Sequence, residues 1–349
     1  MPGGTGRAGA AGPSGGGGDP AAVSGPPRAQ TGTEILESRV PVRTGPEGID
    51  ARHLLEQLLP MARTLLERAG GHDRTAGGNG ASGAHPAVEA VAIGAAGMAT
   101  LGGQLRAELP GALAESLGVR RLALAADAVT AYAGALGQRP GAVVAAGTGM
   151  IALGTDLSGW RRADGWGHLL GDCGGGAWIG RAGLEAALRA HDGRRGGSAA
   201  LLAAVEAVFG QAPQLPGMLY PRPDRPAVLA SFAPEVARSA AGGDPVSAGI
   251  LARAAAHIAE AAAAVCPPVT PGAKAAPPQV ALTGGLFRTG DPLLVPLREE
   301  LAVQLPYAHL VPSSGDPLTG ALVIASALAT GSLRLPRDPA LLHVPPEQG

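Results

Sequence analysis

Polar or glycine-rich residues follow three apolar runs in this sequence of 349 residues. Asp127 comes directly after the run 119–126, Gly147-Thr148-Gly149 joins two short runs, and Gly284-Gly285 ends a further one. In open α/β sheets, ligands bind beyond the carboxyl ends of the strands. Glycines at such ends let backbone N–H groups approach an oxyanion without help from a lysine, and Thr148 adds a hydroxyl. These sites are therefore candidates for holding the phosphates of a nucleotide.

The Asp127 carboxylate lies between a predicted strand and a predicted helix. A carboxylate in this place can accept the proton of a substrate hydroxyl that attacks a phosphoryl group, but it can equally cap the helix. Taken alone, Gly147-Thr148-Gly149 is consistent with a plain hairpin turn, and Asp172 with an ordinary turn aspartate. Arg161 and Arg162 could contact phosphate, although a solvated turn is the simpler interpretation. The local sequence leaves these alternatives open.

Composition and charge exclude several classes of protein. The 27 basic and 28 acidic residues give a net charge of −1, which argues against binding to nucleic acid or to an acidic membrane. Lys274 is the only lysine and follows no glycine-rich turn, so we expect no P-loop or protein-kinase lysine. Cys173 and Cys266 cannot form a four-cysteine zinc site or hold an iron–sulfur cluster in one chain, and they favour a reducing compartment. We find no signal peptide and no unbroken apolar run of about 18 residues, so we expect a cytoplasmic protein.

Apolar periodicity predicts strands that alternate with helices, which indicates an α/β fold. Residues 1–32 are rich in glycine and proline, which predicts a disordered start. Residues 33–42 alternate as an exposed strand would, and Asp50 is expected to cap a helix that ends at Gly70-Gly71. Further strands are expected at 88–94, 119–126, 141–146, 150–154, 279–283 and 309–311. Further helices are expected at 105–117, 128–136, 177–189, 199–208, 227–241, 246–265, 291–304 and 316–329.

The order and spacing of these sites resemble the N-acetylglucosamine kinase and BadF–BadG-type ATPase family. Ala126-Asp127-Ala128 and Gly147-Thr148-Gly149-Met150 are followed by the block DGWGHLLGDCGG at 164–175, in the family's order. Downstream, Leu282-Thr283-Gly284-Gly285 is similar to the family's adenosine turn, and residues 316–322 to its closing helix. The resemblance covers about 88–330. It implies an α/β protein with a two-lobed, actin-like ATPase (ribonuclease H-like) fold.

The same resemblance implies an ATP-dependent kinase that acts on N-acetylglucosamine or a related amino sugar, with ATP and Mg²⁺ as cofactors. Asp127 would be the general base. The ATP-binding residues would be Gly147, Thr148, Gly149, Gly284 and Gly285, and the sugar-binding residues Gly165, Trp166 and Asp172, together with Asp127. No metal ligand is assigned, and homodimers are common in the resembling family.

The resemblance also divides the chain and shows departures. It implies an N-terminal lobe at 33–137 with a returning helix at 316–332, a C-terminal lobe at 138–315 and a tail at 333–349. The family's first phosphate loop, a strand that ends in Asp-x-Gly-Gly-Thr, is echoed only at residues 3–7, without the strand that should precede it. Met150, Ala126 and Cys173 replace the family's serine, asparagine and glutamate. The alternatives are therefore a truncated or non-catalytic relative that binds sugar or nucleotide and, less favoured by the cysteine pattern, an ATPase that activates a reductase.

Overall fold

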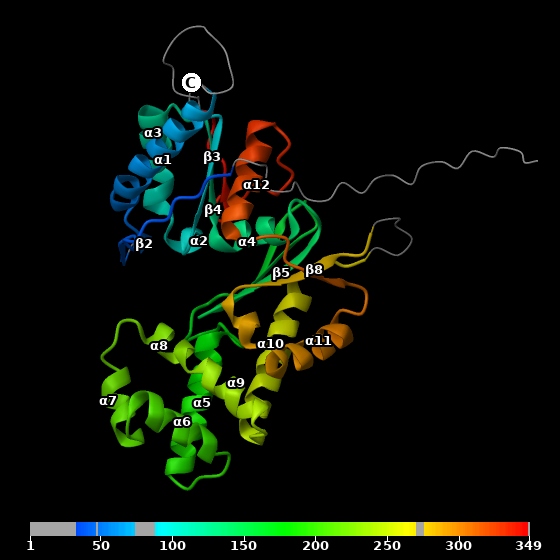
Figure 1. Ribbon diagram of the computed structural model, residues 1–349. Helices are drawn as coiled ribbons and strands as arrows, with labels where there is room; N and C mark the ends of the chain where they lie inside the picture. Colours follow the sequence, from blue (N-terminus) through cyan, green and yellow to red (C-terminus); the bar gives the residue numbers. More distant parts are fainter. Residues whose placement is uncertain (1–32, 47, 74–87, 270–275, 348–349) are drawn as a thin grey trace, which may run out of the picture. The chain divides into compact units, whose positions relative to one another are not determined.

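The computed structural model describes residues 33–46, 48–73, 88–269 and 276–347 (Figure 1). The expected disordered start at 1–32, which includes the phosphate-loop echo, lies outside the described residues. Ile35–Gly349 forms one compact unit. Helices and strands alternate along it, so the predicted α/β class is confirmed.

A three-stranded sheet carries Asp127 at the end of its central strand. The strand β4 (Arg121–Ala126) pairs in parallel with β3 (Ala90–Ala95) and antiparallel with β10 (Leu342–His343). Ala95 lies opposite Ala126, so the chain leaves the two parallel strands at the same edge of the sheet. The residues that follow β3 are thereby brought beside Asp127, where α4 (Asp127–Leu136) begins.

Helices in addition to α4 pack around this sheet. They are α1 (Ala51–Asp73), α2 (Met98–Leu101), α3 (Gly103–Leu117) and α12 (Pro317–Ala329), and the hairpin of β1 (Thr44–Gly45) and β2 (Gly48–Ile49) precedes α1. The Asp50 carboxylate accepts the backbone N–H of His53 at 3.0 Å, which confirms the expected cap. Leu109 and Leu113 of α3 and Leu124 of β4 are fully buried in one apolar core.

Helix α4 lies unusually close to α12, and two glycines permit the approach (Figure 1). A Cβ added at Gly320 would lie 1.9 Å from the carbonyl oxygen of Thr130, and one added at Gly134 would lie 2.1 Å from that of Asp316. Any larger residue would push the helices apart. Because α4 begins at Asp127, this contact also fixes the position of the candidate base.

A five-stranded sheet holds the remaining glycine sites, in the order β7–β6–β5–β8–β9. Its strands are β5 (Gly141–Ala146), β6 (Met150–Thr155), β7 (Trp160–Asp164), β8 (Gln279–Thr283) and β9 (His309–Pro312). The strands β5, β6 and β7 form an antiparallel meander, whereas β5, β8 and β9 are parallel. The turn 147–149 and Gly284 therefore leave β5 and β8 at the same edge.

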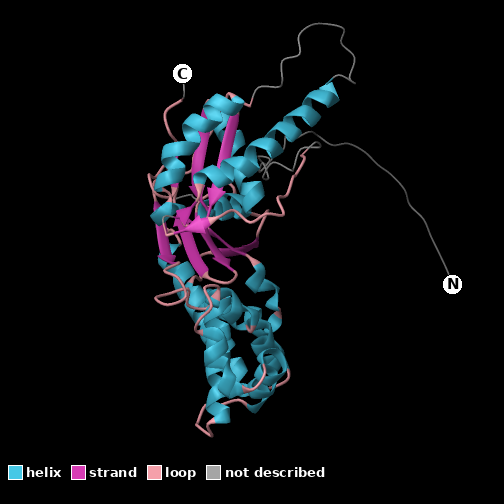
Figure 2. Cartoon of the chain, turned by 90° about the vertical axis from the view of Figure 1, so that its left-hand side faces the viewer, coloured by secondary structure: helices cyan, strands magenta, loops and turns pink. Residues whose placement is uncertain are grey.

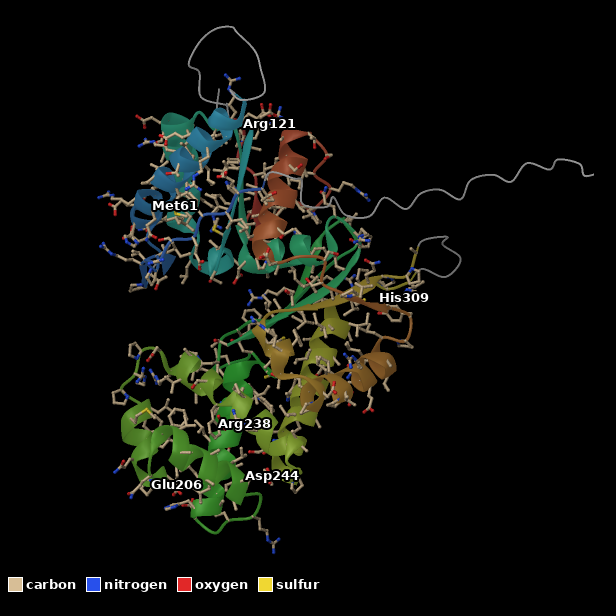
Figure 3. The ribbon with its side chains drawn as sticks, in the orientation of Figure 1. Met61, Arg121, Glu206, Arg238, Asp244 and His309 are labelled. Carbon is tan, nitrogen blue, oxygen red and sulfur yellow. The ribbon has the colours of Figure 1, made fainter. Side chains whose placement is uncertain are left out.

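The chain between β7 and β8 forms a block of helices without a strand among its described residues (Figure 2). These helices are α5 (Gly176–His191), α6 (Ala199–Phe209), η1 (Ala212–Gln214), α7 (Leu215–Leu219), α8 (Arg225–Ser231), α9 (Ala233–Ala241) and α10 (Pro245–Val265). Asp244, labelled in Figure 3, caps α10 by accepting the Ser247 N–H at 2.8 Å. The short helix η2 (Gly285–Thr289) and α11 (Asp291–Gln304) follow β8. Ile258 and Ala262 of α10 and Leu297 of α11 are fully buried in this second apolar core.

Several predicted elements differ from the structure. Residues 33–42 form no strand, and Ile35 and Val40 are 65% and 58% exposed. Alternation of apolar and polar residues therefore does not form a strand where a pairing partner and a core contact are missing. The helix α1 continues to Asp73 rather than ending at Gly70-Gly71. The helix expected at 227–241 is two helices, α8 and α9, which meet at Phe232. The strands β1, β2, β7 and β10 were not predicted.

By length and composition alone, α10 could cross a membrane, contrary to the expectation that no such segment exists. Only half of its apolar window is buried inside the structure, but the buried face packs on α11, α9 and the sheet. Core helices of globular proteins pass the same test, and we interpret α10 as one.

Candidate active site

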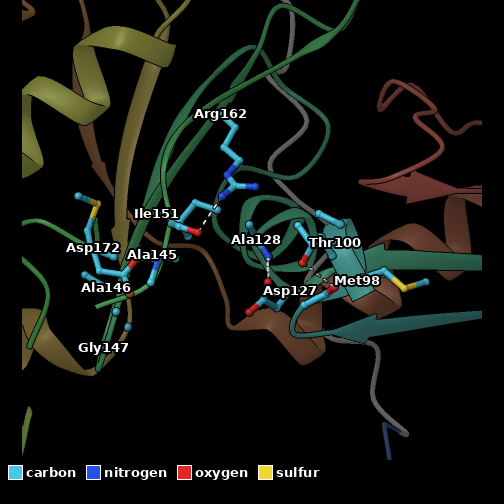
Figure 4. Close-up of a pocket in the computed structure, with 18 of the residues that line it drawn as sticks. Met98, Thr100, Asp127, Ala128, Ala145, Ala146, Gly147, Ile151, Arg162 and Asp172 are labelled. Carbon is cyan, nitrogen blue, oxygen red and sulfur yellow. Dashed lines mark hydrogen bonds between the residues drawn. The ribbon is translucent and has the colours of Figure 1, made fainter. Parts of the chain in front are cut away.

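A cavity of about 450 Å³ lies where the ends of β3, β4, β5 and β8 meet the loop after β7 (Figure 4). Its size is that of a small-molecule site. Glycines and alanines make up much of the wall, so backbone atoms are close to the space inside. The lining residues are Gly97, Met98, Ala99, Thr100, Ala126, Asp127, Ala128, Ala145, Ala146, Gly147, Gly149, Met150, Ile151, Arg162, Gly165, Gly167, Asp172, Gly284 and Leu341.

Asp127 presents its carboxylate to this cavity from the first residue of α4. Oδ1 accepts the backbone N–H of Ala128 at 2.9 Å, as Figure 4 shows. The carboxylate is reached by solvent, yet protein atoms on several sides replace much of its water, and this desolvation raises the pKa of Asp127 above its usual value. The Ala128 N–H and the charge of Arg162 partly oppose that rise. A base with a raised pKa is a stronger proton acceptor, which suits proton abstraction from a hydroxyl.

The turn between β5 and β6 is fastened to the N-terminus of α5. Gly176 N–H donates to the Gly147 carbonyl and Ala177 N–H donates to the Thr148 carbonyl, both at 2.8 Å. The positive end of the α5 dipole therefore lies behind the turn. A turn of this kind, with glycines facing the cavity, can bring backbone amides to a phosphate.

Gly284 passes very close to the end of β5. Its φ is 106°, in the region that favours glycine, and an added Cβ would lie 2.2 Å from the carbonyl oxygen of Ala146. Gly284 thus allows the chain after β8 to form part of the cavity wall beside the 147–149 turn.

The loop between β7 and α5 is organised by two aspartates with left-handed backbone conformations. Asp164 has a φ of 60° and Asp172 a φ of 55°, which aspartate tolerates better than most residues. The Asp164 carboxylate accepts the N–H groups of Asp172 and Cys173, and the Asp172 carboxylate accepts that of Gly167 at 3.0 Å. Desolvation raises the pKa of Asp172, the Gly167 N–H lowers it, and the charge of Asp164 adds to the rise.

Six of the residues that the sequence singled out come together at this cavity: Asp127, Gly147, Gly149, Gly165, Asp172 and Gly284. Three do not line it. Thr148 is exposed at the centre of the turn, Gly285 is exposed at the start of η2, and the Trp166 side chain is 65% exposed outside the cavity wall. Their assigned roles stay predictions.

Asp164 was missed as a site residue, and Arg162 was considered as a phosphate contact but set aside in favour of a solvated turn. The turn expected at Arg161-Arg162 is the strand β7, and Arg162 is half-buried and lines the cavity. The segment 97–100 was missed as well, although the signal was present: parallel strands end at a common edge, so the residues after β3 had to lie near Asp127.

Cys173, which stands where the resembling family has a glutamate, does not line the cavity. It is half-buried, and desolvation together with the charge of Asp164 raises the pKa of its thiol. The thiol is therefore protonated at neutral pH, which argues against a nucleophilic role.

The wall of the cavity leaves room for a nucleotide, because Gly147, Gly149 and Gly284 line it without side chains. A Cβ added at Gly149 would lie 2.4 Å from a carboxylate oxygen of Asp172, so a side chain there would displace this carboxylate. Among the described residues, no group of three or more His, Cys, Asp or Glu side chains could hold a metal ion. Mg²⁺ that arrives with ATP needs no such cage, because the phosphates and water supply most of its ligands.

The sequence matches the model of a known protein family. The sequence profile of the BadF/BadG/BcrA/BcrD ATPase family matches residues 32–325.

Two solved structures with similar folds are provisionally assigned N-acetylglucosamine kinases. The one from Chromobacterium violaceum is 28% identical with a TM-score of 0.53, covering 77% of this chain and 86% of that one. The one from Porphyromonas gingivalis is 18% identical with a TM-score of 0.49, covering 76% and 83%.

A curated relative is similar over a shorter stretch. The N-acetylmuramic acid/N-acetylglucosamine kinase of Clostridium acetobutylicum is 44% identical over 69 residues. This match spans 20% of the present chain and 22% of the relative.

Proposed function

Because the chain belongs to the BadF/BadG/BcrA/BcrD ATPase family, we propose that it is an ATP-dependent kinase for N-acetylglucosamine or a related amino sugar. The observation that carries this proposal is that Asp127, at the end of the three-stranded sheet, lines one cavity with Asp172 and with the glycine sites of the five-stranded sheet. The similarity to the Chromobacterium violaceum protein and to part of the clostridial kinase supports the choice of an amino sugar.

In the proposed reaction, Asp127 accepts the proton of the sugar hydroxyl as the hydroxyl oxygen forms a bond to the γ-phosphorus of ATP. The bond between that phosphorus and the β–γ bridging oxygen breaks, and ADP leaves with the electron pair. The site's contribution is mainly position and charge, because this transfer needs little covalent help from the protein. Bound Mg²⁺ would neutralise charge on the β- and γ-phosphates.

Different groups on the cavity wall suit the two substrates. The turn 147–149, backed by the N-terminus of α5, offers backbone amides for phosphates, and Gly284 offers a flat surface for the adenosine. On the sugar side, Asp172 can accept hydrogen bonds from sugar hydroxyls, and the Gly167 N–H holds its carboxylate in place. Asp127 lines the same cavity from the end of the other sheet, where a base could reach a sugar hydroxyl bound beside the phosphates.

The proposal is tested by ATP consumption with a panel of hexoses and N-acetylhexosamines. We expect N-acetylglucosamine or a close relative to support turnover, and Asp127→Asn to reduce kcat by about 100-fold or more with unchanged ATP affinity. Unchanged turnover in Asp127→Asn would refute the assignment of the base. ATP binding without phosphorylation of any sugar would refute the kinase and favour a non-catalytic relative that binds nucleotide.

A further inference from the structure

Arg162 reaches the cavity from an edge strand. It pairs with Leu153 across β6 and β7, and side chains alternate along a strand, so Arg162 and Arg161 point to opposite faces. Arg161 is exposed, whereas Arg162 is half-buried and lines the cavity with Asp127 and Asp172. Figure 4 shows its side chain extending from the strands into the site.

Three contacts fix the guanidinium of Arg162. Nε donates to the Asp164 carbonyl at 3.0 Å, and Nη2 donates to the Gly165 carbonyl at 2.7 Å. The guanidinium carbon also lies 4.4 Å from the centre of the Trp166 ring, within the range of a cation–π contact. Nη1 takes part in neither hydrogen bond. The charge is thus held in one place with donor capacity left over, which is the preorganisation that transition-state stabilisation requires.

Arg162 is the only cationic side chain among the described residues that line the cavity. The carboxylates of that lining are Asp127 and Asp172, and the charge of Arg162 lowers the pKa of each. An incoming triphosphate adds further negative charge beside these carboxylates. Backbone amides and Mg²⁺ can neutralise part of it, but of the described residues on this wall, Arg162 alone has a positive side chain.

We propose that the Arg162 guanidinium contacts the γ-phosphoryl group of ATP and stabilises the charge that moves during transfer. This inference rests on the proposed function, since it takes the cavity to hold a nucleoside triphosphate. Arg162 should therefore strengthen the binding of ATP but not of ADP, because ADP lacks the γ-phosphoryl group that Arg162 contacts.

The experiment compares the affinities of the non-hydrolysable analogue AMP-PNP and of ADP, each with Mg²⁺, by calorimetry on the full chain. Arg162→Gln removes the charge, and Arg162→Lys keeps a charge but loses the planar fork. Arg161→Gln is the matched control on the opposite face of the same strand. Melting curves establish that each variant is folded.

We expect Arg162→Gln to weaken AMP-PNP binding by about 10- to 100-fold, as for loss of a charge-assisted hydrogen bond, and to change ADP binding by less than about threefold. Arg162→Lys should lie between Arg162→Gln and the wild type, and Arg161→Gln should match the wild type. Turnover of Arg162→Gln should fall by about 100- to 1,000-fold.

A purely structural role for Arg162 gives a different result. If Arg162 only holds the loop at Asp164 and Gly165, then Arg162→Gln will weaken AMP-PNP and ADP equally or leave both unchanged, and the assignment is overturned. If the wild type binds neither nucleotide, both the role of Arg162 and the proposed function are refuted. If the wild type binds both but phosphorylates no sugar, the kinase proposal fails while the comparison of nucleotides still decides the role of Arg162.

Discussion

Asp164 accepts the backbone N–H of Asp172 through Oδ1 at 2.6 Å, which joins the end of β7 to the turn before α5. Its other oxygen accepts the N–H of Cys173 at 2.9 Å. Asp172 in turn holds Gly167, so one chain of hydrogen bonds closes the whole loop. The orientation of the Asp172 carboxylate in the cavity therefore depends on Asp164, which is not in the cavity lining.

Asp164→Ala should loosen this loop. Two backbone donors lose a charged acceptor, so we expect the free energy of unfolding to fall by about 1–3 kcal/mol, measured by denaturant titration. The KM for the sugar should rise more than the KM for ATP, because Asp172 loses its support. Asp156→Ala removes a similar turn carboxylate before β7 and should change neither KM. Equal KM changes in both variants would contradict the role given to Asp164.

The pH dependence of turnover should report on Asp127. A general base must be ionised, so kcat/KM should fall as the pH drops through the pKa of Asp127. Because desolvation raises this pKa, the acid limb should lie above the usual range for an aspartate. Arg162 lowers the same pKa, so Arg162→Gln should move the acid limb to still higher pH. A limb that Arg162→Gln leaves in place would argue against their electrostatic coupling.

The ionised Asp127 carboxylate should also lower the free energy of unfolding of the ligand-free protein. Folding raises the pKa of this acid, so the folded state disfavours its ionised form, and the wild type gains stability as the pH falls through the folded-state value. Asp127→Asn has no such titration. We expect it to be slightly more stable than the wild type at neutral pH and to lose that advantage in acid. Denaturant titrations of both proteins at neutral and at acidic pH measure the difference in the free energy of unfolding. A variant that is less stable than the wild type at neutral pH would show that desolvation is not the main influence on the Asp127 carboxylate.

Gly284→Ala and Gly285→Ala form a matched pair of neighbours. Alanine at 284 needs a φ of 106° and a ψ of 167°, a region that is essentially limited to glycine and costs other residues about 1–3 kcal/mol, and its Cβ would meet the Ala146 carbonyl at 2.2 Å. Alanine at 285 would meet only the flexible end of Arg288 at 3.6 Å. We expect Gly284→Ala to lower both thermal stability and nucleotide affinity, and Gly285→Ala to leave stability within about 0.5 kcal/mol of the wild type. Equal losses of stability would contradict the close approach of β8 to β5.

Much of the fold was predictable because local patterns and core packing agree. The apolar runs at 141–146 and 279–283 predict buried strands, and the structure pairs them as parallel neighbours in one sheet. The strand β7 was missed because its sequence WRRAD carries two arginines and lies at a sheet edge, where charged side chains are tolerated. The strand β10 has two residues, too few to show any periodicity.

The candidate site was predictable where a residue type alone suggests chemistry, as with Asp127 and the glycine turns. The local sequence offered Arg162 only as an alternative phosphate contact and gave no signal for Asp164, because their positions depend on how β7 pairs with β6. Leu341 reaches the cavity only through the pairing of β10 with β4, a contact that spans more than half of the sequence. Such long-range contacts leave no local signal.

The C-terminal segment should support the site through Leu342. Its side chain is fully buried in the core around β4, and the carbonyl of the neighbouring Leu341, which lines the cavity, accepts the Ala126 N–H at 2.8 Å. Leu342→Ala should therefore cost about 2–5 kcal/mol of stability and also weaken nucleotide or sugar binding, since Ala126 immediately precedes Asp127. Leu322→Ala on α12, where the side chain is 49% exposed, is the matched control and should change stability by less than about 1 kcal/mol. Denaturant titration and calorimetry measure the two effects, and a stable Leu342→Ala variant would mean that β10 contributes little to holding the end of β4.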